Sequence, residues 1–153
     1  MKHPAAIEAL AGLAPRRAAT DRLFIRRTNT TKRVLHNLDA VEAAATRLGF
    51  RTIEPGRMSF AEQIEAFAGA RIVAGVSGAD LTNIAFMPRG GDVVCLLPAA
   101  GRNFFFWDVC CLRGHRYWSV FGPGLTGRGG GHDDFTVDAD LAATILERAV
   151  SAP

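Results

Sequence analysis

The residues best suited to bind a ligand lie in the turn Ser77-Gly78-Ala79, which follows an apolar run over residues 71–76. The run predicts a buried strand, and the residues after the turn predict a short helical segment that ends before Pro88. Such a strand-to-helix turn leaves backbone N–H groups that can bind a phosphate. Ligands of open α/β sheets lie at the carboxyl ends of strands. The alternative is a short connection that binds nothing, since such loops are common.

Some residues of this stretch favour the binding of an anion, and one disfavours it. Gly78 and Ala79 allow a diphosphate to approach the N–H groups closely, although small residues also serve the tight packing of a turn. Ser77 can donate one hydrogen bond to a phosphate or cap the helical segment. Asp80 stabilises an empty helix N-terminus, but its charge repels a diphosphate placed there. The turn therefore predicts an anion site that one carboxylate opposes.

Other motifs predict no site. Residues 122–127 match GxGxxG, but that motif needs a helix, which the glycines of residues 127–131 cannot form, so we expect a mobile surface loop. Residues 132–134 (His-Asp-Asp) predict a solvated loop rather than a metal site, because adjacent residues rarely converge on one ion. His115 precedes a strand and is expected to be structural. No Ser-His-Asp set can be assembled from the sequence.

The composition is that of one globular domain. The chain has 153 residues, of which 48% are apolar and 22% charged. No apolar run approaches the roughly 18 residues of a membrane span, and the N-terminus lacks the apolar core of a signal peptide. We therefore expect a cytoplasmic protein with no transmembrane segment. Cys95, Cys110 and Cys111 lack the spacing of a metal site or a disulfide framework, which predicts buried thiols.

Positive charge is concentrated in the first third of the chain. Residues 1–57 carry 11 Lys or Arg against 5 Asp or Glu, whereas the remainder is acidic. Such a patch is typical of a surface that meets phosphates, nucleic acid or anionic lipid, or of a solvated face. Because no aromatic interleaving or nucleic-acid motif accompanies it, we expect no nucleic-acid partner.

Strand and helix signals alternate along the chain. Strands are predicted at residues 23–25, 51–54, 71–76, 92–97 and 115–121, and helices at residues 38–48, 59–68 and 103–112 and after Asp138. Ser59 and Glu62 predict a capping box, and Asn37 and Asp138 predict N-caps. The predicted apolar helix faces are Phe60, Ile64 and Phe67 in one helix, and Leu141, Ile145 and Ala149 in the last.

This alternation predicts an α/β fold with a Rossmann-like, doubly wound parallel sheet covered by helices on both faces. Residues 1–20 are rich in alanine and contain Pro4 and Pro15. They predict a short N-terminal helix or linker, and residues 21–153 form the Rossmann-like domain.

Four blocks of residues follow one another between residues 22 and 121. They are Phe24-Ile25-Arg26-Arg27 with Arg33 and Asn37; Ser59-Phe-Ala-Glu-Gln63 with Phe67-Ala-Gly-Ala70; Gly78-Ala79 with Leu81-Thr82-Asn83, Phe86 and Pro88; and Gly114-His115-Arg116-Tyr117-Trp118. This ordered set resembles the C-terminal half of glycosyltransferase family 61 proteins, which in bacteria are often described as capsular polysaccharide biosynthesis proteins.

The resemblance implies one half of a GT-B glycosyltransferase, in which two Rossmann-like domains face each other and the C-terminal one holds the nucleotide-sugar donor. Such an enzyme transfers a sugar to a glycan hydroxyl with inversion, and it needs no metal or cofactor. Because the chain is too short for both domains, we expect a donor-binding fragment or remnant, inactive alone. Its expected partners are the donor and a separate N-terminal acceptor-binding domain, and a homo-oligomer is left open.

The resemblance also implies a set of donor-binding residues, and it identifies no catalytic base. The implied nucleotide-sugar site consists of Arg27, Arg33, Ser77, Gly78, Ala79, Thr82 and Asn83. Arginine suits a phosphate because its planar fork donates two parallel hydrogen bonds. The alternatives are a solvated basic face for the two arginines and turn or helix-end capping for Thr82 and Asn83.

Four positions depart from the family pattern. Ser77 stands where the family usually has His, Asp80 where it has Gly, Cys95 where it has Glu, and Leu38 where it has Glu. The first three lie near the expected donor site. They favour a rival hypothesis, a non-catalytic binding or interaction module that kept the fold and lost the donor chemistry.

Overall fold

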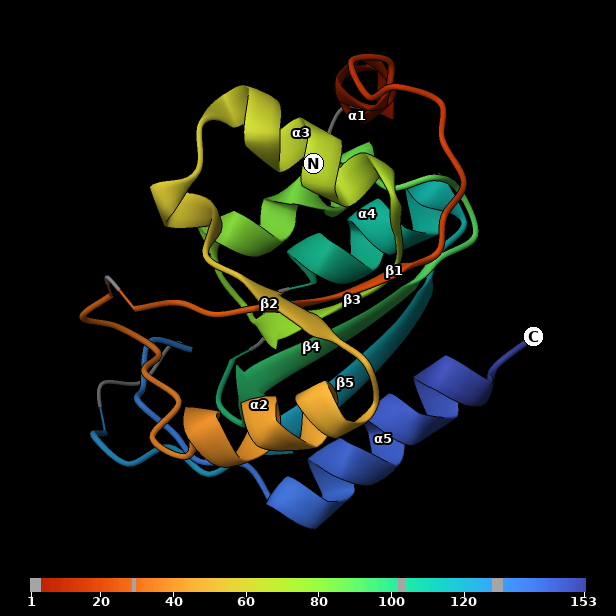
Figure 1. The fold of residues 1–153 in the computed structure, drawn as a ribbon. Coiled ribbons are helices and arrows are strands. Elements are labelled where there is room, and N and C mark those ends of the chain that lie inside the picture. Colours follow the sequence, from red (N-terminus) through yellow and green to blue (C-terminus); the bar gives the residue numbers. More distant parts are fainter. Residues whose placement is uncertain (1–3, 29, 102–103, 128–130) are drawn as a thin grey trace.

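The computed structural model describes residues 4–28, 30–101, 104–127 and 131–153. These residues form one sheet of five parallel strands in the order β2-β1-β3-β4-β5 (Figure 1). The strands are β1 (Asp21–Ile25), β2 (Arg51–Ile53), β3 (Ala70–Val76), β4 (Asp92–Pro98) and β5 (Arg116–Gly122). The predicted α/β fold with a parallel sheet is confirmed. Its strand order is one of the common doubly wound orders, with the reversal of direction between β1 and β3.

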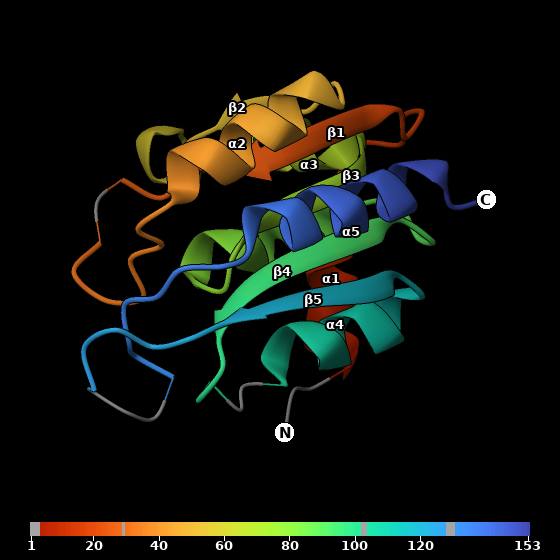
Figure 2. The same ribbon diagram turned by 90° about the horizontal axis from the view of Figure 1, so that it is seen from below.

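Helices cover both faces of the sheet, as Figure 2 shows in a second view. One face carries α2 (Leu38–Arg47) and α5 (Ala139–Ser151), which pack against each other. The other face carries α1 (Pro4–Ala11), α3 (Phe60–Ala68), α4 (Phe105–Arg113) and the 3₁₀ helix η2 (Ala79–Phe86); a second, short 3₁₀ helix, η1 (Pro55–Arg57), follows β2. With both faces covered, the edges of the sheet are left for ligands.

The strands divide their side chains between two cores. In β1, Leu23 and Ile25 join the core under α1, α3, α4 and η2, whereas Phe24 joins the core under α2 and α5. All three are fully buried. Because successive strand residues point to opposite faces, a strand that is apolar at every position must be covered on both sides, which is the pattern of a parallel sheet.

Two of the three predicted helix caps are confirmed. The Ser59 hydroxyl accepts a hydrogen bond from the backbone N–H of Glu62, and the Glu62 carboxylate accepts one from the N–H of Ser59, at 2.7 Å. These bonds hold the pKa of Glu62 below its usual value. Asp138 accepts from the N–H groups of Asp140 and Leu141. Each cap satisfies N–H groups that would otherwise lack a partner at the start of the helix.

The prediction that Asn37 caps α2 is wrong. Its side-chain Nδ2 donates to the backbone oxygen of Val137 at 2.7 Å, and its Oδ1 accepts from the N–H of Val137 at 3.2 Å. The amide thus pairs with both backbone polar groups of Val137, 100 residues away, because an amide side chain carries both a donor and an acceptor. This pair joins the start of α2 to the segment that leads into α5.

Two predicted apolar faces need correction. Phe60 in α3 is 57% exposed, and its ring meets only the edge of Phe86 in η2, with ring centroids 5.8 Å apart. In α5 the buried stripe is Ala142, Leu146 and Ala149, while Leu141 is exposed and Ile145 is half-buried. Both stripes of α5 have helical spacing. Packing against α2 and the sheet determines which stripe is buried, so the sequence of α5 by itself cannot predict it.

The segment after β5, predicted from its glycines to be a mobile loop, contains some β-structure. Strand β5 extends to Gly122, and Gly124 forms an antiparallel bridge with Phe135. Helix α4 begins at Phe105 rather than at Asn103, and Asn103 lies outside the described residues, as do residues 128–130 of the predicted mobile loop.

His115 precedes β5 as a buried, neutral side chain. Its Nδ1 accepts a hydrogen bond from the N–H of Gly91 at 3.1 Å, and burial lowers its pKa to about 4. This arrangement fits the structural role expected of it, since it braces the turn that precedes β4.

We predict a pH dependence of stability from His115. Its folded pKa lies below the unfolded value of about 6.5, so the unfolded chain binds more protons between these values and stability falls as the pH drops from 6.5 to 4. Replacing His115 with Gln should remove up to about 3 kcal/mol of this loss, measured by urea unfolding at pH 7 and pH 4. His36→Gln, at an exposed position, is the matched control. An H115Q chain that loses stability with acid as steeply as the H36Q chain would contradict the assignment.

Candidate functional site

The candidate site lies at the carboxyl edge of the sheet, between β1 and β3. These strands pair through Ile25 and Gly75, so the chain leaves both at the same edge. After β1 it runs to α2 on one face, and after β3 it runs to η2 on the other (Figure 1). Diverging loops open a crevice between neighbouring strands, which is where ligands of doubly wound sheets bind.

Arg27 covers the turn that follows β3. Its Nη1 donates to the backbone oxygen of Ser77 at 3.4 Å, and its Nη2 donates to the hydroxyl of Thr30 at 2.9 Å. A Cβ on Gly78 would lie 2.6 Å from this Nη1 and 2.7 Å from the guanidinium carbon. The backbone of Gly78 is extended rather than left-handed. A side chain at position 78 would therefore have to displace this guanidinium.

Arg33 approaches the same turn from the loop before α2. Its backbone is left-handed, with φ 57°, and its N–H donates to the backbone oxygen of His132 at 3.4 Å. Its side-chain Nε is buried and has no hydrogen-bond acceptor among the described residues. A buried donor without a partner costs free energy, so this guanidinium can still bind an acceptor.

A small cavity of about 190 Å³ brings four of the seven predicted donor-binding residues together. Its lining residues are Arg33, Gly78, Ala79, Thr82, Phe105 and Phe106. Arg27 lies directly on Gly78. Burial lowers the pKa of Arg27, and the charge of Arg33 lowers it further, whereas Asp80 raises it. Two guanidinium groups at one turn repel each other, and an anion between them would relieve that repulsion.

A second depression, of about 470 Å³, lies at the ends of β1 and β2, and Arg27 and Asp80 are among the residues that line it. Its charged groups largely neutralise one another. Arg26 pairs with Asp39 and Glu42, hydrogen bonds that raise its pKa, and an exposed Arg57 pairs with Glu54 at 3.0 Å. The depression is therefore less suited to an anion than the cavity at the turn.

Asp80 lies close to the guanidinium of Arg27. Its Oδ2 is 3.9 Å from Nε of Arg27, and its side chain is 28% exposed, so the pair is partly screened by water. The sequence predicts that Asp80 opposes a diphosphate. The structure adds that Asp80 partly neutralises the arginine expected to bind it.

Ser77 and Asn83 face the interior. Ser77 is 2% exposed, its N–H donates to the backbone oxygen of Leu96 at 3.0 Å, and its hydroxyl lies near the Cys95 thiol. Asn83 donates through Nδ2 to Gln63 at 2.8 Å and to the backbone oxygen of Asp80 at 3.1 Å. These bonds hold β3 against β4 and η2 against α3, so both side chains support the turn from behind.

The cysteine prediction holds for two of three thiols. Cys95 and Cys110 are buried, whereas Cys111 is exposed on α4. Burial raises the pKa of Cys95 to about 12, so this thiol stays protonated. The hydroxyl of Tyr117 lies near Cys95, and burial raises the pKa of this hydroxyl as well.

The expectation of a solvated loop at residues 132–134 is wrong for its two carboxylates. Asp133 and Asp134 are 5% and 9% exposed. Asp133 accepts from the hydroxyl of Thr126 at 2.9 Å, and Asp134 accepts from the N–H of Val34 at 3.0 Å. Buried carboxylates need such donors. The Asp134 bond ties the loop after β5 to the loop before α2. Within the described ranges, no three His, Cys, Asp or Glu residues form a group able to hold a metal ion.

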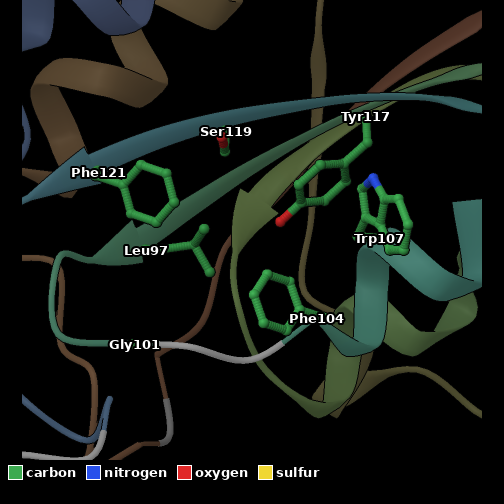
Figure 3. Close-up of a pocket in the computed structure, with 7 residues that line it drawn as sticks. All are labelled: Leu97, Gly101, Phe104, Trp107, Tyr117, Ser119 and Phe121. Carbon is green, nitrogen blue, oxygen red and sulfur yellow. The ribbon is translucent and has the colours of Figure 1, made fainter.

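The sequence reasoning missed an aromatic pocket that lies along β5, between this edge strand and the start of α4. Figure 3 shows this cavity of about 320 Å³, with the Tyr117 hydroxyl directed between Leu97 and Phe104. Its lining residues are Leu97, Gly101, Phe104, Trp107, Tyr117, Ser119 and Phe121. The signal that could have indicated it is the unbroken run of aromatic residues at 104–107, within the segment predicted only to be a helix.

Comparison with known proteins gives one match. The family model described as Glycosyltransferase 61 matches residues 3–94, which include β1 to β3, η2 and the turn with Arg27 and Gly78. No curated protein matches the chain significantly. In the ranges described, no helix has both the length and the apolar character that crossing a bilayer requires.

We predict that Gly78→Ala moves Arg27 at little cost in stability. The new Cβ would meet the flexible end of an arginine, which can swing away, so the free energy of unfolding should change by less than about 1 kcal/mol. The NMR signal of the Arg27 Nε–H should shift. Gly75→Ala is the matched comparison, because its Cβ would lie 2.8 Å from Cβ of Ile25 in the core and should cost about 1–3 kcal/mol. An unshifted Arg27 signal in G78A would contradict the packing described.

Proposed function

The chain belongs to the glycosyltransferase 61 family, and from that premise we propose that it is the donor-binding domain of a glycosyltransferase. The enzyme would transfer a sugar from a nucleotide-sugar to a glycan hydroxyl. The observation that carries this proposal is the convergence of Arg27, Arg33 and the Gly78-Ala79 turn at the β1–β3 switch point. The doubly wound parallel sheet supports an assignment to one half of a GT-B enzyme.

Charge supports a diphosphate in the cavity at the turn. Burial and the nearby charge of Arg33 lower the pKa of Arg27, and Asp80 offsets this only in part. Phosphate oxygens accept the parallel hydrogen bonds that a guanidinium offers. An oxygen that reached Nε of Arg33 would supply the acceptor that this atom lacks in the described part of the chain.

The same groups have a role in sugar transfer. As the bond between the sugar and the diphosphate breaks, negative charge grows on the leaving phosphate oxygens. Fixed positive groups and backbone N–H groups stabilise that charge, and they do so without reorganisation. Arg27, Arg33 and the start of η2 would serve in this way. A base must also remove the proton of the acceptor hydroxyl, and we assign no residue to that step.

A second candidate function rests on Asp80. Its carboxylate lies 3.9 Å from Nε of Arg27 and meets part of that charge without any ligand. Ser77, where the family usually has His, is buried against Cys95 and adds no charge to the cavity. Both observations favour a non-catalytic module that retains the fold. The two functions differ in whether the cavity binds a diphosphate.

We predict opposite effects of two substitutions on diphosphate binding. Asp80→Asn removes a repelling charge at nearly constant shape and should tighten binding by about 1 kcal/mol, or several-fold. Arg33→Ala removes a charged donor and should weaken binding about tenfold or more. Calorimetry with pyrophosphate and with a nucleoside diphosphate at fixed ionic strength measures both effects.

Arg51→Ala is the matched control for net charge. Arg51 starts β2 at the opposite edge of the sheet and is largely exposed, so its loss should leave both affinities nearly unchanged. If neither the wild-type chain nor D80N binds either compound at millimolar concentration, the donor-binding proposal fails and the non-catalytic module is favoured.

A further inference from the structure

The aromatic pocket along β5 leaves several large apolar side chains exposed to solvent. Phe104 is 67% exposed, Trp107 50% and Phe121 52%. Together with Leu97 and Tyr117 they surround one concave space of about 320 Å³ (Figure 3). Leaving such surface in water costs free energy that a bound apolar group would recover, and concave apolar sites with few polar groups are typical of small-molecule sites.

The polar groups of this pocket are few and uncharged. Its lining side chains offer the hydroxyls of Tyr117 and Ser119, and the Tyr117 hydroxyl also lies near the buried Cys95 thiol. A sugar ring carries a hydroxyl on most of its carbons, and most would lose water here without gaining a partner. A phosphate would find no charged side chain among these lining residues. A flat heteroaromatic ring, with two apolar faces and a few polar atoms on its edge, fits this chemistry.

The pocket and the arginine cavity lie on two sides of the start of α4. Phe104 and Trp107 line the pocket, while the two residues between them, Phe105 and Phe106, line the cavity that contains Arg33. The backbone of residues 104–107 therefore lies between the two spaces. The aromatic pocket extends along β5 from Phe121, near the carboxyl end of the strand, back to Tyr117.

Buried side chains also connect the two sites. The Cys95 thiol lies near enough to the hydroxyls of Tyr117 and Ser77 for both to influence its pKa, and Ser77 is the residue just before Gly78. These three residues come from neighbouring strands β5, β4 and the end of β3. The wall of the aromatic pocket and the phosphate turn are thus held in a fixed relation.

We propose that the aromatic pocket binds the base of the nucleoside diphosphate whose phosphates occupy the arginine cavity. This inference rests on the proposed function and adds a base-binding site made of Phe104, Trp107 and Tyr117. All three residues lie beyond residue 94, outside the part of the chain that the family model matches. The base stacks on the aromatic side chains, and its edge meets the hydroxyl of Ser119.

Tryptophan fluorescence tests the proposal directly. The chain has two tryptophans. Trp118 packs on the opposite face of β5 and donates to Asp92 at 2.8 Å. In a Trp118→Phe chain, Trp107 is the only tryptophan. Uridine, adenosine or their diphosphates should then quench the emission of Trp107, because a stacked base contacts its ring, whereas pyrophosphate alone should not.

Calorimetry on variants separates the base from the phosphates. Trp107→Ala should weaken binding of the better nucleoside diphosphate about tenfold and leave pyrophosphate binding unchanged. Trp107→Phe should recover most of the loss, because it restores an aromatic face. Phe60→Ala removes an aromatic side chain that is 57% exposed on α3 and is the matched control, expected to change neither affinity.

The outcomes distinguish this inference from the proposed function. If pyrophosphate binds but no nucleoside or nucleoside diphosphate quenches Trp107, the base site is wrong and the diphosphate site stands. If neither class binds, both proposals fail. If sedimentation shows that the wild-type chain self-associates and W107A does not, the pocket is an interface between copies, and the base site is overturned.

Discussion

The contact between the guanidinium of Arg27 and the backbone of Gly78 is the interaction on which the candidate site depends. It joins the loop after β1 to the turn after β3 at the switch point of the sheet. Any side chain at position 78 would displace it. Because this contact holds Arg27 on Gly78 and Arg33 lines the small cavity at the start of η2, two positive groups flank the turn.

The covered sheet explains why the candidate site lies at a strand end. Helices cover both faces of the five strands, so the loops beyond the strand ends are left for a ligand. The cavity lined by Arg33 and the aromatic pocket along β5 lie on either side of the start of α4. This arrangement suits a ligand with phosphates at one end and an aromatic ring at the other.

The features that could be predicted from the sequence are those that a local pattern of residues determines. The apolar run at residues 71–76 and the small residues after it placed the turn at a strand end, and the structure confirms that position. The family resemblance supplied Arg33 and Thr82, which line the cavity with Gly78. What it missed depends on contacts between distant segments. The bond between Asn37 and Val137 and the pocket shared by α4 and β5 become visible only when the chain is folded.

The central claim is that an anion binds at the Gly78 turn, and amide chemical shifts test it most directly. With a ¹⁵N-labelled chain titrated with pyrophosphate, the account predicts that the largest shifts fall on the backbone N–H groups of Gly78, Ala79 and Thr82 and on the side-chain Nε–H of Arg33. Shifts that leave these signals in place and fall instead around Arg16 and Arg17, in the exposed basic segment before β1, would contradict it.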